Sequence, residues 1–585
     1  MFSIFTKLAW FFKENWKRYS VAIFFLILVG ILEVLPPRII GMAIDDIFIG
    51  ALTSTQLTKY LLYLVVITMA TYALTYIWMY QLFGGSHLLE KKVRSRLMSH
   101  LLRMTPTFYE KNRTGDLMAR ATNDLQAIST TAGFGVLTLV DSSIYMITIL
   151  ITMIVFVSWE LTLVSILPLP IMAILIQIYG KKIHARFTSA QDAFGDMNDR
   201  VLESVAGVRV IRAYVQERAD EKQFSDMTED VYNKNIEVAK IDSLFEPTIK
   251  ILVGLSYLIG LGYGAYLVFH QSLTLGELVS FNVYLGMLIW PMFAIGELIN
   301  VMQRGNASLD RVQDTLSYEE DVKNPVNPLN VNNPSTIQFN HVTFQYPSSK
   351  VPNLSSVNVQ LKKGETLGIV GKTGSGKTTF IKQLLREYPV GDGLLSVGDV
   401  PINQQLKAKT REWIGYVPQD HVLFSRSVRD NILFGSEEKT DKDLQKAIDL
   451  AVFSKDLERL PEKLETLVGE KGVALSGGQK QRISIARALI KNPEILILDD
   501  SLSAVDAKTE AEIIENIRHE RSDKTTIITT HRLSAVQHAD WIIVLDDGCV
   551  SEEGTHKELL QKDGWYKEQW VRQQIEETTL EEVSR

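Results

Sequence analysis

Six apolar stretches dominate the first half of the chain and limit what it can fold into. They cover about residues 18–42, 58–83, 134–157, 160–180, 247–269 and 277–301. A helix needs about 20 mainly apolar residues to cross a bilayer, and only helices and closed barrels satisfy their backbone hydrogen bonds in lipid. The sequence therefore predicts a membrane α-helical bundle of six spans, with Pro36 and Pro37 kinking the first span.

Lys and Arg residues gather in two of the connections between these stretches. The long connections 84–133 and 181–246 are rich in both, whereas those near 46–57, 158–160 and 270–275 contain neither. Short loops that carry an excess of Lys and Arg stay on the cytoplasmic side of a membrane. We therefore expect a multi-pass protein whose long loops and two termini are all cytoplasmic.

The two long connections are expected to continue the spans as helices beyond the lipid. They contain few prolines and keep a helical periodicity, and about 25 helical residues extend about 37 Å. Turns are predicted over Tyr109–Asp116 and near Val208–Gln216. The pattern alone leaves two alternatives open, because these turns either contact a cytoplasmic domain or lie free in solvent.

Three acidic residues fall within the apolar stretches, at Glu33, Asp141 and Glu297. Ionisable residues inside a membrane are costly and usually serve a function. An acid that faces a central cavity would attract a cationic substrate. Pairing with a neighbouring helix and a position near the membrane surface are the alternatives.

The second half of the chain has the pattern of a soluble α/β domain. Strand-like apolar runs alternate with helical segments after a turn-rich segment at 324–334, which contains three prolines and five asparagines. We predict a membrane domain over 1–305, a linker over 306–335, a nucleotide-binding domain over 336–575 and a tail over 576–585. The net charge of -7 argues against a nucleic-acid partner, and a single cysteine, Cys549, excludes an internal disulfide.

A glycine-rich segment lies between an apolar run at Thr366–Val370 and a predicted helix at Thr379–Leu385. It consists of Gly371, Lys372, Thr373, Gly374, Ser375, Gly376, Lys377 and Thr378. Strand, glycine-rich turn, Lys-Thr and helix form the P-loop pattern, in which backbone N–H groups and the helix N-terminus bind phosphate. Lys377 supplies a positive charge and the Thr378 hydroxyl is placed to bind Mg²⁺. The segment therefore predicts a site for a nucleoside triphosphate and Mg²⁺.

A second apolar strand, Ile495–Asp499, ends in two acids. In a P-loop domain, an acid such as Asp499 holds Mg²⁺ through water. Asp500 follows at the strand tip, where a carboxylate is well placed to orient an attacking water.

These motifs, and others beside them, resemble those of ATP-binding cassette (ABC) proteins. Leu475–Gln479, which reads Leu-Ser-Gly-Gly-Gln, resembles the signature motif of that family, and it lies about 20 residues before the acidic strand. Ser503–Asp506 resembles the D-loop, Val468–Gly472 resembles a motif of ABC exporters, and Arg113–Asp116 resembles their first coupling helix. The resemblance covers nearly the whole chain and implies an exporter-type membrane bundle joined to an α/β P-loop domain that binds ATP and Mg²⁺.

The resemblance also assigns roles to individual residues. Those expected to bind ATP are Tyr346, which stacks on adenine, Gly371 to Thr378, Thr379, and the signature residues Ser476, Gly477, Gly478 and Gln479. The expected metal-binding residues are Thr378, Gln419 and Asp499, and the expected catalytic residues are Asp500, His531 and Gln419.

One residue departs from the family pattern. The residue after the Mg²⁺-linked aspartate is usually glutamate, the general base, and here it is Asp500. Losing one methylene withdraws the carboxylate by about 1.5 Å, and such a misplacement costs about 10²-fold in rate. We therefore expect slow hydrolysis at this site, unless the backbone adjusts to restore the reach.

The family works as dimers in which each ATP lies between the P-loop of one subunit and the signature of the other. An intact signature beside a weakened base resembles one subunit of the heterodimeric multidrug exporters of bacteria. The expected function is ATP-driven efflux of amphipathic drugs across the bacterial plasma membrane, with a second half-transporter as partner. A lipid or glycolipid flippase and a regulatory ATP-sensing subunit are the alternatives.

Overall fold

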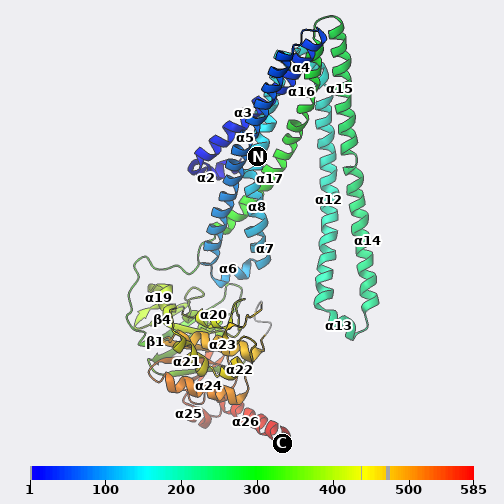
Figure 1. The fold of residues 1–585 in the computed structure, drawn as a ribbon. Coiled ribbons are helices and arrows are strands. Elements are labelled where there is room, and N and C mark those ends of the chain that lie inside the picture. The colour runs from blue at the N-terminus through cyan, green and yellow to red at the C-terminus, as the bar shows by residue number, and fades with distance from the viewer. Residues whose placement is uncertain (1–2, 437, 470–474, 585) are drawn as a thin grey trace. The chain divides into compact units, whose positions relative to one another are not determined.

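The computed structural model describes residues 3–436, 438–469 and 475–584 (Figure 1). The chain forms two compact units, which we describe separately. The membrane unit comprises residues 1–102 and 115–318, and the α/β unit comprises residues 103–114 and 319–585.

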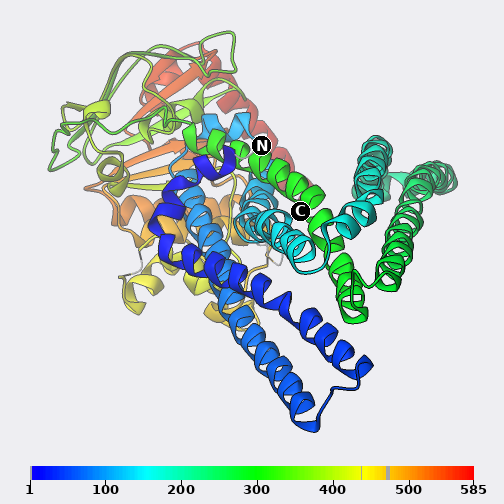
Figure 2. The ribbon, with the colours of Figure 1, turned by 90° about the horizontal axis from the view of Figure 1, so that it is seen from above.

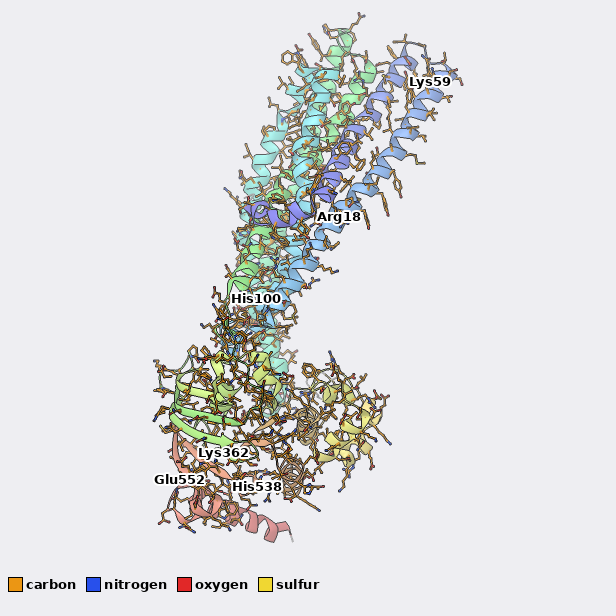
Figure 3. All side chains as sticks on the ribbon, turned by 90° about the vertical axis from the view of Figure 1, so that its left-hand side faces the viewer. Arg18, Lys59, His100, Lys362, His538 and Glu552 are labelled. Carbon is orange, nitrogen blue, oxygen red and sulfur yellow. The ribbon has the colours of Figure 1, made fainter. Side chains whose placement is uncertain are left out.

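The membrane unit contains six helical runs, within the described residues, that are long and apolar enough to cross a bilayer. They are Trp16–Phe48, Ser54–Leu101, Thr114–Phe156, Trp159–Ala206, Glu217–Phe269 and Leu275–Ser317. The six predicted spans are confirmed, and each run extends beyond its apolar stretch. Figure 3 marks the length of one of them, α5 (Ser54–Leu101), through Lys59 and His100 near its two ends.

Four of these runs are interrupted within their apolar parts, and one of the four divides at Leu167 between α11 (Trp159–Ile166) and α12 (Pro168–Ala206). The first divides at Val34 into α3 (Trp16–Glu33) and α4 (Leu35–Phe48), because Pro36 and Pro37 stand in the first turn of α4. The predicted kink is thus a helix break. The third run holds a π-helix, η2 (Asp141–Tyr145), between α9 (Phe134–Val140) and α10 (Met146–Phe156), and the sixth divides at Leu288. No sequence pattern predicted this π-helix.

The other helices of the membrane unit form parts of these runs, except for the first two and the one at Val208–Ala213, which lie outside them. They are α1 (Ser3–Lys7), α2 (Ala9–Glu14), α7 (Thr114–Ala119), η1 (Arg120–Asp124), α8 (Leu125–Ala132), α11 (Trp159–Ile166), α12 (Pro168–Ala206), α13 (Val208–Ala213), α14 (Glu217–Asp242), α15 (Phe245–Phe269), α16 (Leu275–Met287) and α17 (Ile289–Ser317). The antiparallel pair α12 and α14 lies side by side and is joined by the short helix α13 (Figures 1 and 2). This connection agrees with the turn predicted near Val208–Gln216.

The α/β unit contains two sheets. The six-stranded sheet has the order β10-β9-β3-β8-β7-β6 and is parallel except for β10, which bears out the predicted parallel sheet. A separate antiparallel sheet has the order β2-β1-β4-β5, and the sequence did not predict it. The strands are β1 (Thr336–Phe344), β2 (Leu354–Lys362), β3 (Thr366–Gly371), β4 (Asp392–Val397), β5 (Val400–Pro401), β6 (Ile414–Val417), β7 (Ile495–Asp499), β8 (Thr525–Thr529), β9 (Trp541–Asp546) and β10 (Cys549–Gly554).

Both faces of the parallel sheet are buried, and strands of the antiparallel sheet contribute to the core on one of them. Along β7, Leu496 and Leu498 enter one apolar core, while Ile495 and Ile497 enter another. A strand buried on both faces is a continuous apolar run, as this one is. The longer helices are α18 (Lys377–Leu384), α21 (Asp441–Leu450), α23 (Gly477–Ile490), α24 (Ala507–Glu520) and α26 (Trp565–Ser584). The shorter ones are η3 (Ile402–Gln404), α19 (Lys407–Glu412), α20 (Val428–Leu433), α22 (Ser454–Arg459), η4 (Lys463–Glu465), η6 (Leu533–Ala535) and α25 (His556–Gln561).

One short helix from the first half of the chain belongs to the α/β unit. This helix is α6 (Pro106–Lys111), and it lies a few residues before the predicted coupling segment Arg113–Asp116, most of which forms the start of α7. The resemblance assigned the coupling helix to Arg113–Asp116 and its neighbours, so that assignment stays a prediction; Pro106 stands in the first turn of α6, a position that proline favours. Helix α17 continues to Ser317, so the expected linker over 306–335 begins as helix.

Candidate active site

The P-loop connects the end of β3 to the start of α18, where both the sheet and the helix position it. Gly371, Gly374 and Gly376 adopt φ values of +147°, +84° and +106°, which side chains rarely allow. A Cβ on Gly371 would lie 2.2 Å from the backbone oxygen of Leu545, whereas one on Gly374 would meet no atom within 4 Å. Gly371 is thus required by packing, and Gly374 leaves its backbone open to a ligand.

Lys377 lies at the mouth of this turn. Its Nζ donates to the backbone oxygens of Gly371 at 2.8 Å and Lys372 at 2.9 Å. Burial lowers the pKa of Lys377, although Asp500 and Asp499 nearby favour its charged form. The buried hydroxyl of Ser375 has no hydrogen-bond partner among the described residues. A buried cation and an unused donor suit a bound phosphate group, so these residues fit ATP.

Asp499 is buried at the end of β7 and accepts three hydrogen bonds. The donors are the hydroxyls of Thr529 at 2.6 Å, Thr378 at 3.2 Å and Tyr416 at 3.3 Å. The Thr378 hydroxyl and the Asp499 carboxylate lie close together, and Mg²⁺ prefers such oxygen ligands. The structure therefore brings two predicted metal-binding residues together, and the third, Gln419, lies beside Asp500.

Asp500 lies in a left-handed backbone conformation, with φ of +46°. Its N–H donates to the backbone oxygen of Thr529 at 2.9 Å, and its Oδ2 accepts from Nε2 of Gln419 at 3.3 Å. Burial raises the pKa of the Asp500 carboxyl, while His531 and Lys377 act in the opposite direction. The predicted catalytic residues Asp500, Gln419 and His531 thus share one site with Lys377.

A glutamine that the sequence did not single out holds the loop of His531. Gln573 on α26 donates from Nε2 to the backbone oxygen of His531 at 2.8 Å, and its Oε1 accepts from the N–H of Leu533 at 2.9 Å. Burial, with a smaller effect of Lys377, lowers the pKa of His531, which favours the uncharged imidazole. Gln573 therefore holds the backbone on both sides of Arg532 and so positions the backbone from which the His531 side chain extends.

Tyr346 lies next to the P-loop helix, as its predicted role requires. Its hydroxyl donates to Oγ1 of Thr379 at 3.1 Å. Its ring packs edge-on against that of Tyr388, with the two ring centroids 4.9 Å apart. The hydroxyl of Tyr388 in turn donates to the Glu110 carboxylate on α6. The sequence missed Tyr388, which connects the residue expected to stack on adenine with the short helix α6.

The signature residues form the N-terminus of α23. Ser476 is the N-cap, and its hydroxyl oxygen accepts a hydrogen bond from the N–H of Gln479. The side-chain oxygen of Gln479 in turn accepts from the N–H of Ser476. Behind them, Asp456 on α22 accepts from Gln479 at 3.3 Å and pairs with Arg482 at 2.9 Å. Ser476 and Gly477 are exposed, so the helix end is held from behind and open in front.

Part of the predicted exporter motif Val468–Gly472 cannot be placed. Residues 470–474 lie outside the described residues, and Val468 is buried in the core of the α/β unit.

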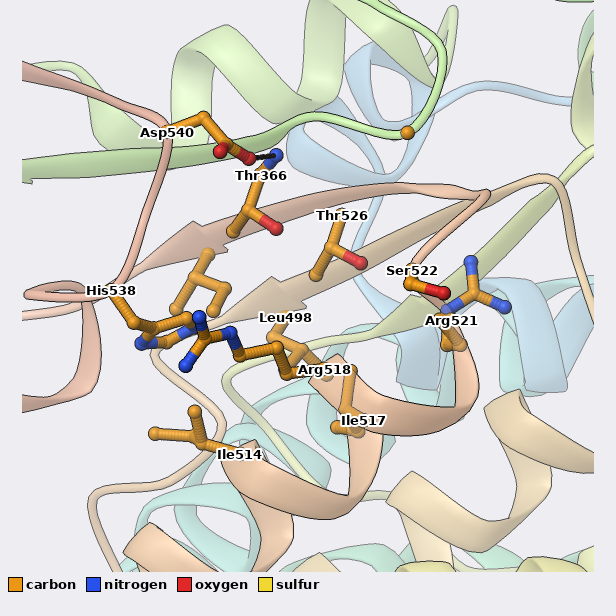
Figure 4. Close-up of a pocket in the computed structure, with 12 residues that line it drawn as sticks. Thr366, Leu498, Ile514, Ile517, Arg518, Arg521, Ser522, Thr526, His538 and Asp540 are labelled. Carbon is orange, nitrogen blue, oxygen red and sulfur yellow. Dashed lines mark hydrogen bonds between the residues drawn. The ribbon is translucent and has the colours of Figure 1, made fainter.

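A different cavity of the α/β unit, of about 210 Å³, lies away from the P-loop (Figure 4). Thr366 and Thr526, which line it, stand at the beginning of β3 and β8, whereas the P-loop follows the end of β3. Asp540 closes one side by accepting from the N–H of Thr366 at 2.7 Å. This cavity is therefore at the opposite edge of the sheet from the predicted site residues.

Comparison with known proteins agrees with this geometry over the full chain. The ABC transporter transmembrane region matches residues 19–292, and the ABC transporter family matches residues 354–503. The probable multidrug resistance ABC transporter ATP-binding/permease protein YheI of Bacillus subtilis (strain 168) is 64% identical over 98% of both chains. The multidrug resistance-like ATP-binding protein MdlA of Escherichia coli (strain K12) is 41% identical over 98% of this chain and 97% of its own.

A solved structure confirms the fold. A bacterial Atm1-family ABC exporter with ATP bound matches 95% of this chain and 99% of its own, with a TM-score of 0.80 and 24% identity. The exporter fold predicted from the sequence is thus confirmed in both halves. Six spans, a P-loop, an acidic strand end and a signature helix occur in one chain, which belongs to the ABC transporter family and is a multidrug-type exporter with an ATP-hydrolysing domain.

Proposed function

We propose that this chain is one subunit of an asymmetric heterodimeric exporter of amphipathic compounds, of the BmrCD type. The observation that carries the proposal is Asp500, a short carboxylate at the position of the general base, in a site whose other parts are complete. The contacts of Lys377 with the P-loop backbone, of Asp499 with Thr378 and of Gln419 with Asp500 support this reading.

The geometry of Asp500 supports slow hydrolysis. Its N–H is bound to Thr529 in the parallel sheet, so the backbone is fixed where it would have to move to restore the missing reach. Its carboxylate already accepts from Gln419. General-base assistance is worth about 10² to 10⁴ in rate, and a base held about 1 Å short loses about 10² of it.

Two exposed surfaces support a second subunit. The open N-terminus of α23 presents Ser476 and Gly477, and a helix N-terminus of this kind binds phosphate. The tip formed by α13 exposes the apolar side chains of Val210, Tyr214 and Val215, by 61%, 73% and 79%. In contrast, Phe108 of α6 is only 1% exposed within the α/β unit. A second half-transporter would cover the surfaces that this chain leaves open.

We propose the following roles at the chain's own site. Bound ATP with Mg²⁺ supplies the phosphate bond whose cleavage resets the transporter. Lys377 and the P-loop N–H groups would hold the phosphates, Thr378 and Asp499 would hold Mg²⁺, which would neutralise phosphate charge, and Tyr346 would stack on adenine. Asp500 would orient the attacking water weakly, and His531 would contact the terminal phosphate. Gln419 reports the state of the site to the membrane unit.

We place the protein in the bacterial plasma membrane with both termini and both long loops in the cytoplasm. The concentration of Lys and Arg in the connections 84–133 and 181–246 supports this orientation. A lipid or glycolipid flippase would share the same architecture and differ only in substrate. A regulatory subunit is disfavoured, because Gln419, His531 and the signature are all retained.

Co-purification tests the heterodimer. The tagged chain is extracted from its native host, and its partner is identified by mass spectrometry. The proposal expects a second half-transporter with glutamate after its acidic strand, and expects ATP-dependent uptake of a fluorescent amphipathic drug by proteoliposomes that contain both chains. A chain that purifies as a self-paired dimer and transports the drug alone contradicts the proposal.

A further inference from the structure

The side-chain hydroxyl of Thr529 bonds to both acids at the end of β7. It donates to Oδ1 of Asp499 at 2.6 Å, and its oxygen accepts from the backbone N–H of Asp500 at 3.1 Å. The same N–H also donates to the backbone oxygen of Thr529 at 2.9 Å, so it is shared between two acceptors of one residue. A single side chain therefore holds the carboxylate expected to bind Mg²⁺ and the backbone of the expected base.

The sheet fixes the position of this hydroxyl. Thr529 is the last residue of β8, an interior strand, and it pairs with Asp499 in the parallel ladder between β7 and β8. It is only 1% exposed, so water has no ready access to replace its hydrogen bonds. A β-branched side chain is stiff at χ1, which limits the directions that the hydroxyl can take. The contact with the two acids is thus set before any ligand binds.

The bond from Thr529 is the shortest of the three that Asp499 accepts. Thr378 and Tyr416 donate to the same carboxylate at 3.2 Å and 3.3 Å. The Thr378 hydroxyl is itself expected to bind the metal, whereas Thr529 is enclosed in the sheet. Hydrogen bonds to an ionised acceptor are the strong ones, so Thr529 is the partner best placed to fix the orientation of the carboxylate.

The hold on Asp500 matters because its backbone is strained. Its φ of +46° lies in the left-handed region, which is unfavourable for a residue other than glycine. Such a conformation persists only where the surrounding structure imposes it. The two acceptors that Thr529 offers to the Asp500 N–H supply part of that constraint. Loss of the hydroxyl would leave the backbone oxygen of Thr529 as the remaining acceptor of the pair.

We propose that Thr529 is a positioning residue of the ATP site, whose hydroxyl orients the Asp499 carboxylate for Mg²⁺ and holds the Asp500 backbone in place. Partners that hydrogen-bond to a metal-binding carboxylate orient it, and their loss costs about 10- to 100-fold in metal affinity or activity. The inference deepens the proposed function, because it rests on the roles proposed there for Asp499 and Asp500.

The test compares the affinity for ATP with and without metal. The full chain is purified in lipid nanodiscs, and binding of a fluorescent ATP analogue is titrated in EDTA and in saturating Mg²⁺. Thr529→Val keeps the shape of the side chain and removes the hydroxyl, whereas Thr529→Ser keeps the hydroxyl. Thr525→Val is the matched control, because Thr525 is buried at the other end of β8 and its hydroxyl donates to the backbone oxygen of Lys362 at 3.5 Å.

We expect Thr529→Val to bind the analogue as the wild type does in EDTA and to lose about tenfold in affinity in saturating Mg²⁺. Thr529→Ser should recover most of that loss, and Thr525→Val should match the wild type under both conditions. An equal loss in EDTA and in Mg²⁺ would show that the hydroxyl only stabilises the fold, and it would overturn the proposal. Wild-type affinity of Thr529→Val under both conditions would also overturn it.

A second measurement separates this inference from the proposed function. In a two-subunit complex that carries Asp500→Glu, Thr529→Val should lower kcat for ATP by about tenfold, since a small misplacement of a catalytic group is costly. Fast hydrolysis by the wild-type chain alone, together with a Mg²⁺-specific loss in Thr529→Val, would contradict the weak base and leave the role of Thr529 standing. Slow hydrolysis by the wild-type chain alone, without a Mg²⁺-specific loss in Thr529→Val, would overturn the role of Thr529 and leave the weak base standing.

Discussion

The P-loop side and the signature side of the α/β unit are held in opposite ways. On the P-loop side, side chains from the start of α18 and from the ends of β6, β7 and β8 converge and bind one another, as the three hydrogen bonds to Asp499 show. On the signature side, Asp456 anchors the helix from behind, while Ser476 and Gly477 remain exposed. The chain thus completes one face of a nucleotide site within itself and leaves the other face for a ligand held elsewhere.

The largest expected effect is on the P-loop side. Lys377→Ala removes the buried cation, and we expect ATP affinity of the isolated chain to fall at least about 100-fold, because a buried phosphate loses its paired charge. Fluorescent ATP binding to the chain alone measures it. Ser476→Asn, which keeps the helix cap, is the matched control and should bind as the wild type. Equal losses in both variants would break the contrast between the two sides.

The signature side should matter only in the assembled transporter. Ser476→Asp keeps the cap of α23 but adds a negative charge where a phosphate binds. We expect the ATPase activity of the two-subunit complex to fall by about 10²-fold, while the affinity of the isolated chain for ATP stays unchanged. Ser476→Asn should lose much less. A Ser476→Asp complex with full activity would show that this helix end faces no nucleotide.

Gln573 tests whether the position of the His531 backbone matters for hydrolysis. Gln573→Leu frees the backbone of His531 and Leu533. In a two-subunit complex that carries Asp500→Glu, where this site contributes to turnover, we expect kcat for ATP to fall about tenfold with little change in KM, since a small misplacement of a catalytic group is costly. Gln573→Glu keeps the acceptor for Leu533 and loses the donor to His531, so it should lie between. A change in KM alone, with normal kcat, would show that Gln573 only stabilises the fold.

The smallest effect concerns the charge of Asp500. Because burial raises its pKa, the folded chain is destabilised by the carboxylate above that pKa, and it gains stability as pH falls through it. We therefore expect Asp500→Asn to raise the thermal midpoint slightly at pH 8, with a gain that shrinks at low pH. A gain that grows on acidification would mean that the carboxylate is instead stabilised by Lys377 and His531.

Much of this architecture follows from local sequence. The six spans and the P-loop depend on runs of neighbouring residues, so apolar length and glycine spacing sufficed to predict them. The residues that were missed act across long separations: Gln573 binds His531 42 positions away, and Tyr388 binds Glu110 278 positions away. No local pattern encodes such pairs, because the fold alone brings them together.

The irregular features were predicted only in part. Pro36 and Pro37 predicted a distortion, because proline has no backbone N–H to donate to the helical hydrogen bonds. The π-helix at Asp141–Tyr145 contains no such residue, so the shared position of Glu33 and Asp141, which line one cavity of the membrane unit, emerged only from the packing of the spans. The antiparallel sheet escaped prediction for the same reason, because pairing of β1 with β4 joins strands that are far apart in the chain.

The most direct test is steady-state ATPase activity of the purified chain in lipid nanodiscs, as wild type and as Asp500→Glu, alone and with its co-purified partner. We predict that both forms hydrolyse almost no ATP alone. We also predict that Asp500→Glu raises the ATPase activity of the complex, because the longer side chain restores the reach of the base. A wild-type chain that alone hydrolyses about 10 ATP per second, a median enzyme rate, would contradict it, because Asp500 would then be an adequate base in a self-sufficient homodimer.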